Sequence, residues 1–175
     1  MNYKYYKIAR DKAWQTLIET NVNSLPINLK DVFSYYNINL KTFINSSDEA
    51  FIKNNTVYFN KSYNIKRVRF TLAHELGHIL LKHENLTHTV HTYKNIEEFQ
   101  ANIFARGLLM PAIVLKEINC IEAQDIANIC NVSLQTAQYR AERMQELLRR
   151  NKFKLSPLER QVHSNFKDFI NSNKI

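Results

Sequence analysis

The chain has 175 residues and a net charge of +8, and its 45% hydrophobic content is enough to bury one main core with a small appendage. No apolar run approaches the roughly 20 residues that cross a bilayer, and the N-terminus lacks the apolar core of a signal peptide, so we expect a cytoplasmic protein without membrane segments. Cys120 and Cys130 have no CxxC spacing, so we expect buried thiols and not a disulfide.

The first predicted elements are helices. Residues 9–21 have helical periodicity, and Asn28 with Asp31 forms a capping pattern that opens a second helix, which runs to about Tyr36. Three short runs of strand character follow: 38–44, 50–53 and 56–60. The pattern predicts a helical N-terminal layer and a small antiparallel sheet. Because the last strand runs directly into the next helix, we expect its edge to be able to accept an extended peptide by strand addition.

A complete HExxH motif lies in the next predicted helix, residues 63–82. His74 and His78 are one turn apart on the same face, so both imidazoles can bind one metal ion, with Glu75 beside it. Zinc held by two neutral histidines and a third ligand keeps a position open for water and lowers the pKa of that water towards about 7. Glu75 can then accept the proton of the water as it attacks a carbonyl, and pass it to a leaving amine. The motif therefore predicts a zinc hydrolase.

Such a motif also arises by chance, so its surroundings matter. The flanking residues are apolar and helix-forming, as an amphipathic helix requires. Gly77 interrupts this helix at a cost of about 1 kcal/mol relative to alanine, which indicates the close approach of another group. The other glycine of the chain, Gly107, lies on the helix predicted to carry the remaining ligand.

A third protein ligand is expected near or after His78. The pattern from 95 to 110 predicts a helix, on which Glu98, Ala101 and Ala105 share one face. The two alanines would let this helix approach the motif helix closely, so that the Glu98 carboxylate could reach the metal. The candidates for the third ligand are His83, Glu84, His88, His91, Glu97 and Glu98.

Other polar residues near these helices have expected roles of their own. Glu97 points about 100° away from Glu98 and should be solvated, and His83 lies off the metal face. Asn102 could contact one of the metal ligands, without binding the metal itself, and so fix the orientation of that ligand. Peptide hydrolysis also needs a donor that stabilises the oxyanion. The connection between the two helices offers three candidates: His88, His91 and Tyr93.

A short helix should follow Pro111, and residues 121–144 then have the pattern of two helices around a turn at Asn131. Ser133 is well placed to cap the second of them. One interpretation puts this second helix in a DNA major groove, and the interpretation that we favour is a packing module. The residues that would read DNA bases are Gln135, Gln138 and Arg140.

Two segments of the sequence resemble the ImmA/IrrE family of metallopeptidase-like proteins: RFTLAHELGHILL, residues 69–81, and EFQANIFARGLLMP, residues 98–111. The resemblance implies that His74, His78 and Glu98 bind one Zn²⁺ and that Glu75 is the catalytic acid and base. It implies a cytoplasmic zinc metallo-endopeptidase whose substrate is a helix-turn-helix transcriptional repressor, encoded with it on a prophage or conjugative element. Cleavage would derepress that element.

Two alternatives remain beside this reading. The first is a regulatory or DNA-binding protein in which zinc only stabilises the fold, and the second is a metallohydrolase that acts on a non-peptide substrate. The order of elements predicts the α+β class. We expect a metallopeptidase domain over residues 1–118, a helix-turn-helix-like segment over 119–150 packed on it, and a basic C-terminal helix or tail over 151–175.

Overall fold

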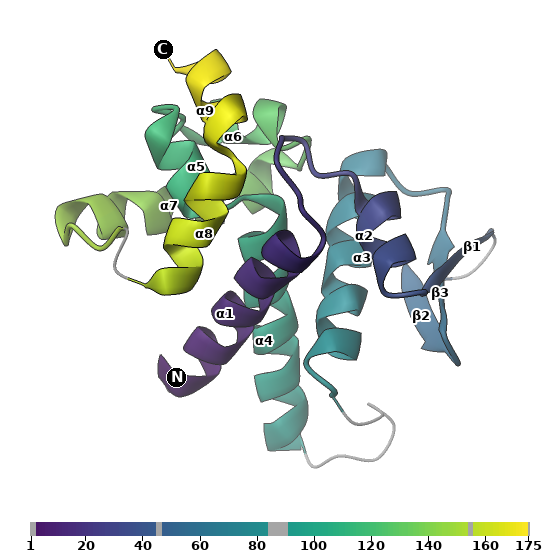
Figure 1. The fold of residues 1–175 in the computed structure, drawn as a ribbon. Helices are drawn as coiled ribbons and strands as arrows, with labels where there is room; N and C mark the ends of the chain where they lie inside the picture. Colours follow the sequence, from purple (N-terminus) through teal and green to yellow (C-terminus); the bar gives the residue numbers. More distant parts are fainter. Residues whose placement is uncertain (1–2, 45–46, 84–90, 154–155, 175) are drawn as a thin grey trace. The chain divides into compact units, whose positions relative to one another are not determined.

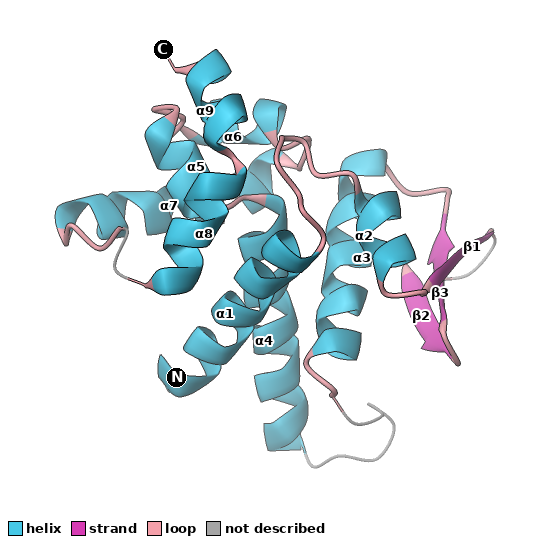
Figure 2. Cartoon of the chain, in the orientation of Figure 1, coloured by secondary structure: helices cyan, strands magenta, loops and turns pink. Residues whose placement is uncertain are grey.

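The computed structural model describes residues 3–44, 47–83, 91–153 and 156–174 (Figure 1). The chain divides into two compact units. The first, called the sheet unit, consists of residues 1–13 and 29–105, and the second, called the helical unit, consists of residues 14–28 and 106–175. Figure 2 shows helices in both units and strands in the sheet unit, so the predicted α+β class is confirmed.

The sheet unit carries the HExxH motif and most of the elements around it. Its helices α1 and α4 both continue into the helical unit. They begin at Tyr3 and His91, several residues before the sequence pattern predicted, because periodicity defines the ends of a helix less well than its middle. The elements are α1 (Tyr3–Glu19), α2 (Leu29–Tyr35), β1 (Asn39–Phe43), β2 (Ala50–Lys53), β3 (Thr56–Asn60), α3 (Ile65–Leu80) and α4 (His91–Leu109).

The sheet has the strand order β1-β3-β2, with β3 in the centre. β2 and β3 are antiparallel, with Ile52 opposite Val57. The turn that joins them contains Asn54, which has a φ of 53°. β1 pairs in parallel with the other side of β3, with Leu40 opposite Val57. The prediction of an antiparallel sheet is therefore wrong for β1. A two-residue turn determines the β2–β3 pair, whereas strand periodicity specifies neither the partner nor the direction of β1.

The position of β3 also corrects the expected site of strand addition. β3 ends at Asn60 and leads into α3, as predicted, but both of its sides are paired with other strands. A central strand has no unpaired backbone groups to offer an incoming peptide. Among the described residues, the outer strands of this sheet are β1 and β2.

Helix α3 is positioned by a cap at its start and by the sheet beneath it. The Asn64 side chain accepts a hydrogen bond from the backbone N–H of Lys66 at 2.9 Å, so the helix has the side-chain cap that its first turn needs. α3 packs on β2 and β3, and α2 packs on β1 and α3. The face of α3 that becomes buried comprises Val68, Leu72, Ala73, Leu76, Gly77 and His78.

The helical unit contains the pair of helices expected around Asn131. Asn131 has a φ of 51°, and Ser133 Oγ accepts the backbone N–H of Thr136 at 3.2 Å, so the predicted cap is confirmed. Cys120 and Cys130 are both buried and are not joined in a disulfide, as predicted. The helices after α4 are α5 (Ala112–Glu117), α6 (Ala123–Ile129), α7 (Leu134–Arg149), α8 (Pro157–Asn165) and α9 (Lys167–Asn173).

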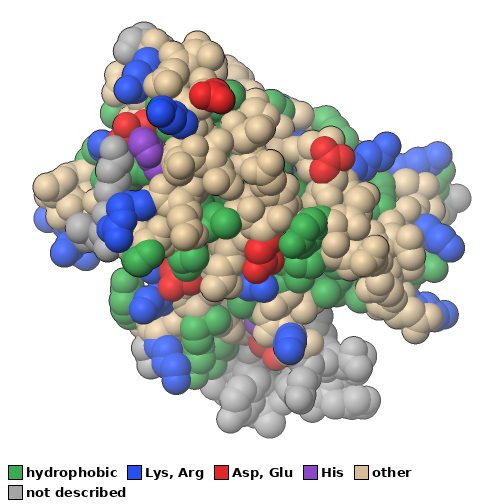
Figure 3. Space-filling model, viewed as in Figure 1, with side chains coloured by type: hydrophobic (Ala, Val, Ile, Leu, Met, Phe, Trp, Pro, Cys, Tyr) green, Lys and Arg blue, Asp and Glu red, His purple; other side chains and the backbone are tan. Residues whose placement is uncertain are grey.

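Arg140 on α7 is not available to read DNA bases. Its side chain is 7% exposed, and Nη2 donates a hydrogen bond to the backbone oxygen of Arg106 at 2.5 Å. The expected set of base-reading residues is therefore reduced to Gln135 and Gln138, which are exposed. On the face seen in Figure 3, described Lys and Arg side chains are dispersed among other residues. None of the helices in the described part of the chain combines the length and hydropathy that a bilayer-spanning segment requires.

Candidate metal centre

The two histidines of the HExxH motif face one another on α3. His74 Nε2 and His78 Nε2 are 3.0 Å apart, and the ring centroids are separated by 4.7 Å. Two nitrogens that bind one tetrahedral zinc ion at 2.0–2.1 Å would lie roughly 3.3 Å apart, which is close to the observed separation. The helical spacing thus brings two imidazole lone pairs to one point.

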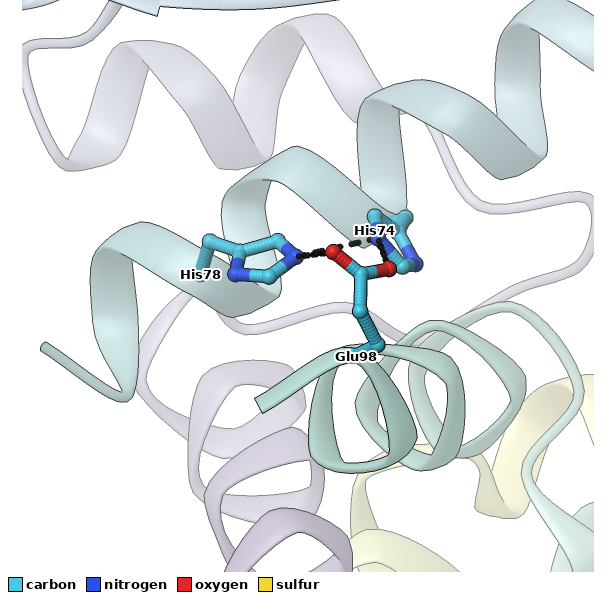
Figure 4. Close-up of side chains that lie close together, drawn as sticks. All are labelled: His74, His78 and Glu98. Carbon is cyan, nitrogen blue, oxygen red and sulfur yellow. Dashed lines mark hydrogen bonds and ion pairs between the residues drawn. The ribbon is translucent and has the colours of Figure 1, made fainter. Parts of the chain in front are cut away.

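The third member of this group comes from α4. Glu98 Oε2 lies 3.2 Å from His74 Nε2, and Oε1 lies 3.7 Å from His78 Nε2 (Figure 4). The ligand atoms of His74, His78 and Glu98 are all within 4.8 Å of one another, so these residues could hold a metal ion. Two imidazoles and one carboxylate form a donor set typical of catalytic zinc sites, which leave a coordination position for water or substrate.

Gly77 allows α3 and α4 to lie this close together. A Cβ added at Gly77 would stand 3.0 Å from Phe104 Cδ1 and 3.2 Å from the backbone Cα of Ala101. Both partners on α4 are fully buried. The close approach predicted at this glycine is confirmed, and the group that approaches is the helix that carries Glu98.

Burial sets the ionisation of the groups around the centre. Burial, together with nearby His74 and His83, lowers the pKa of His78 to about 4, while Glu98 opposes the change. His78 is therefore neutral at pH 7 and can offer a lone pair to a cation. Burial also raises the pKa of Glu75, with a contribution from the Glu98 charge, and His74 opposes that change. A carboxylate with a raised pKa is a better proton acceptor.

Asn102 and Glu97 differ from their expected roles. Asn102 Nδ2 donates to the backbone oxygen of Glu98 at 2.8 Å, so it binds the main chain and not the carboxylate. Glu97 is partly buried, and its Oε2 is enclosed without a hydrogen-bond partner among the described residues, so the prediction that it is solvated is wrong. A helical wheel gives the direction of a side chain but not which segments cover it.

His83 was expected to lie away from the metal face, yet the structure places it against a motif histidine. His83 Nδ1 lies 3.0 Å from His78 Nδ1. Helical spacing does not foresee this contact because α3 ends at Leu80, and the chain then reverses at Lys82, where φ is 56°. Glu84 and His88 lie outside the described residues, as do the side chains of His91 and Tyr93.

A polar cluster that no sequence pattern predicted lies one turn before the motif. Thr71 Oγ1 donates to Glu49 Oε2 at 2.9 Å, and Arg67 Nη2 binds Glu49 Oε1. The hydrogen bond from Arg67 is the main reason why the pKa of Glu49 is lowered. Arg67 and Thr71 are four residues apart on one face of α3, whereas Glu49 is distant from them in the sequence. No sequence pattern therefore indicated that Glu49 belongs to this cluster. The cluster ties the segment before β2 to α3.

Comparison with known proteins agrees with this geometry. A sequence model of the family Peptidase_M78, described as the IrrE N-terminal-like domain, matches residues 21–142 of the chain. The matched span includes the whole of α3 and α4, and hence His74, His78 and Glu98. No curated protein matches the chain.

Proposed function

This chain belongs to the Peptidase_M78 family of IrrE N-terminal-like domains, and we propose on that basis that it is a zinc-dependent endopeptidase. Family membership implies peptidase activity. The observation that carries the proposal for this chain is the convergence of His74, His78 and Glu98 within 4.8 Å. In this proposal these three residues bind one Zn²⁺, and Glu75 is the catalytic base.

Zinc held there would supply a Lewis acid and a water molecule of lowered pKa. The Glu75 carboxylate takes the proton of the attacking water and then gives it to the nitrogen of the leaving amine, so that the peptide C–N bond breaks. Burial of Glu75 favours this proton transfer because it raises the pKa of the carboxyl group. A histidine must be neutral to bind a metal ion, and burial keeps His78 in that form.

The substrate that we propose is a helix-turn-helix transcriptional repressor encoded with this chain on a prophage or conjugative element. Its cleavage in the cytoplasm would derepress that element. Support comes from the resemblance of residues 69–81 and 98–111 to ImmA/IrrE proteins. Burial of Arg140 speaks against the alternative in which the protein acts mainly by reading DNA.

The proposal can be tested by co-expression with the neighbouring repressor-like protein, whose intact mass is followed. We expect the wild-type protein to cut it and Glu75→Gln to cut it about 100-fold more slowly or worse, since loss of a general base commonly has that effect. Glu75→Gln should still bind one zinc. Glu142→Gln, which changes an exposed glutamate on α7, is the matched control and should cleave normally.

Metal content separates the possible failures. His74→Ala and Glu98→Ala should lose zinc, as measured by elemental analysis of purified protein. If zinc content is unchanged in both, the assignment of these ligands is wrong. If the wild type binds zinc and Glu75→Gln cleaves as well as wild type, Glu75 is not the base. If neither the wild type nor Glu75→Gln cleaves the repressor while zinc is bound, a regulatory protein that zinc only stabilises describes this chain better than a peptidase does.

A further inference from the structure

His78 has a neighbour at each of its two ring nitrogens. Nε2 faces His74 and Glu98, the residues that would share the metal with it. Nδ1 lies 3.0 Å from Nδ1 of His83, and the two rings meet at 76°. A hydrogen bond between two imidazole nitrogens needs one proton, so one Nδ1 must donate and the other must accept.

The chemistry of metal binding decides which nitrogen donates. A neutral histidine that binds a cation through Nε2 must carry its proton on Nδ1. His78 Nδ1–H is therefore the donor, His83 Nδ1 is the acceptor, and the proton of His83 lies on its Nε2. We propose that His83 is a positioning residue for the metal centre, which holds the His78 ring in the orientation and tautomer that direct Nε2 at the metal. This inference rests on the proposed function.

The end of α3 fixes His83 in this place. The backbone N–H of His83 donates to the His78 carbonyl oxygen at 3.1 Å, and that of Lys82 donates to the Ile79 carbonyl oxygen at 3.1 Å. These two bonds, with Lys82 in the left-handed region at a φ of 56°, form a Schellman motif. The motif brings the residue two positions beyond the cap back over the last turn. His83 is thus bound to His78 through both main chain and side chain.

Two polar residues of α4 influence the His83 ring. His83 Nε2 is buried and has no hydrogen-bond partner within 3.5 Å among the described residues, and the same is true of Glu97 Oε2. The Glu97 charge and the Gln100 side chain both raise the pKa of His83, against the larger lowering caused by burial. Glu97 therefore acts on His83 through its charge, and not through a hydrogen bond between these two atoms.

The resulting chain of groups runs from His83 to His78 and the metal. Carboxylates commonly orient metal-binding histidines. Here a second histidine takes that place. Loss of such a partner typically weakens metal binding by about 10 to 100-fold. His83→Leu should therefore weaken zinc binding, although His83 itself is not a ligand.

The test measures the zinc dissociation constant of the full chain by competition with a chromophoric chelator. His83→Leu removes the acceptor and should weaken zinc binding by about 10 to 100-fold. His83→Asn places a carbonyl oxygen near the position of Nδ1 and should restore affinity to within about 3-fold of wild type. His163→Leu is the matched control, because His163 lies in the helical unit, and it should bind zinc as wild type does.

Nitrogen NMR of the zinc-loaded wild-type protein gives a readout that does not depend on how the variants fold. His78 should carry its proton on Nδ1, and His83 should carry its proton on Nε2. A proton on His83 Nδ1 would overturn the proposal, as would equal zinc affinity in wild type and His83→Leu. Equal losses in His83→Leu and His83→Asn would also overturn it, since the acceptor would then be irrelevant. If the wild type itself binds no zinc, the proposed function fails first.

Discussion

The ring of Phe104 on α4 lies against the backbone of Gly77 on α3, so closely that a Cβ at position 77 would stand 3.0 Å from Phe104 Cδ1. Gly77 lies between His74 and His78 in the sequence, and His78 follows it directly. The contact therefore sets the separation between the helix that carries the histidines and the helix that carries Glu98. It links helix packing to the geometry of the candidate metal centre.

We predict that Gly77→Ala weakens zinc binding even though alanine favours the helix by about 1 kcal/mol. The new methyl group meets the backbone of Ala101 as well as the buried Phe104 ring, so α3 and α4 must move apart. Overpacking of this kind commonly costs about 1–3 kcal/mol. Chelator competition and thermal unfolding of the apo protein measure the two effects. A more stable variant with unchanged zinc affinity would contradict the prediction.

The stability of the metal-free protein should fall as the pH is lowered from about 6.5 to about 4. Burial lowers the pKa of His78 to about 4, below its ordinary value of 6.5, so in this window the unfolded chain binds a proton that the folded chain does not. The free energy of unfolding therefore increases as the pH rises across this window and decreases as the pH falls. The pKa of His83 is lowered as well, again mainly by burial, and acts in the same direction.

Urea unfolding in the presence of a chelator, repeated across this pH range, measures the effect. His78→Gln removes the principal titrating group and should flatten the pH dependence. If His78→Gln and wild type lose stability in parallel between pH 6.5 and 4, other groups cause the loss.

A third prediction concerns the left-handed residue at the end of α3. Lys82 has a φ of 56°, where a side chain is disfavoured and glycine is not. Lys82→Gly should be more stable than Lys82→Ala by about 1 kcal/mol, because both remove the same charge and only alanine keeps a Cβ. Chemical denaturation of the two variants gives the comparison. An alanine variant at least as stable as the glycine variant would show that this turn is not the cap that holds His83.

Arg140 should matter for stability and not for recognition of DNA bases. Arg140→Ala leaves the Arg106 carbonyl oxygen without its charged donor, which should lower the free energy of unfolding by about 1.5–3 kcal/mol. Arg149→Ala removes an exposed arginine from the same helix and should change it by less than about 0.5 kcal/mol. Equal effects of the two substitutions would mean that the buried hydrogen bond contributes little.

Local patterns determined much of this protein. The helical repeat places residues four apart on one face, so the spacing of His74 and His78 predicted their meeting without knowledge of any other element. The caps and turns behave in the same way. Ser133 reaches an N–H three residues ahead, and the turn at Asn54 joins neighbouring strands, so each depends on a few adjacent residues.

Tertiary structure decided the relationships between distant segments. Strand periodicity is the same whichever neighbour a strand has, so only packing placed β3 in the centre with β1 parallel to it. The helical repeat predicted which face of α4 carries Glu98. The distance from Glu98 to the histidines depends on the close packing of α4 against Gly77. His83 and Glu97 were misjudged for one physical reason. A helical repeat describes a side chain only while the helix continues, and it says nothing about which other segment encloses it.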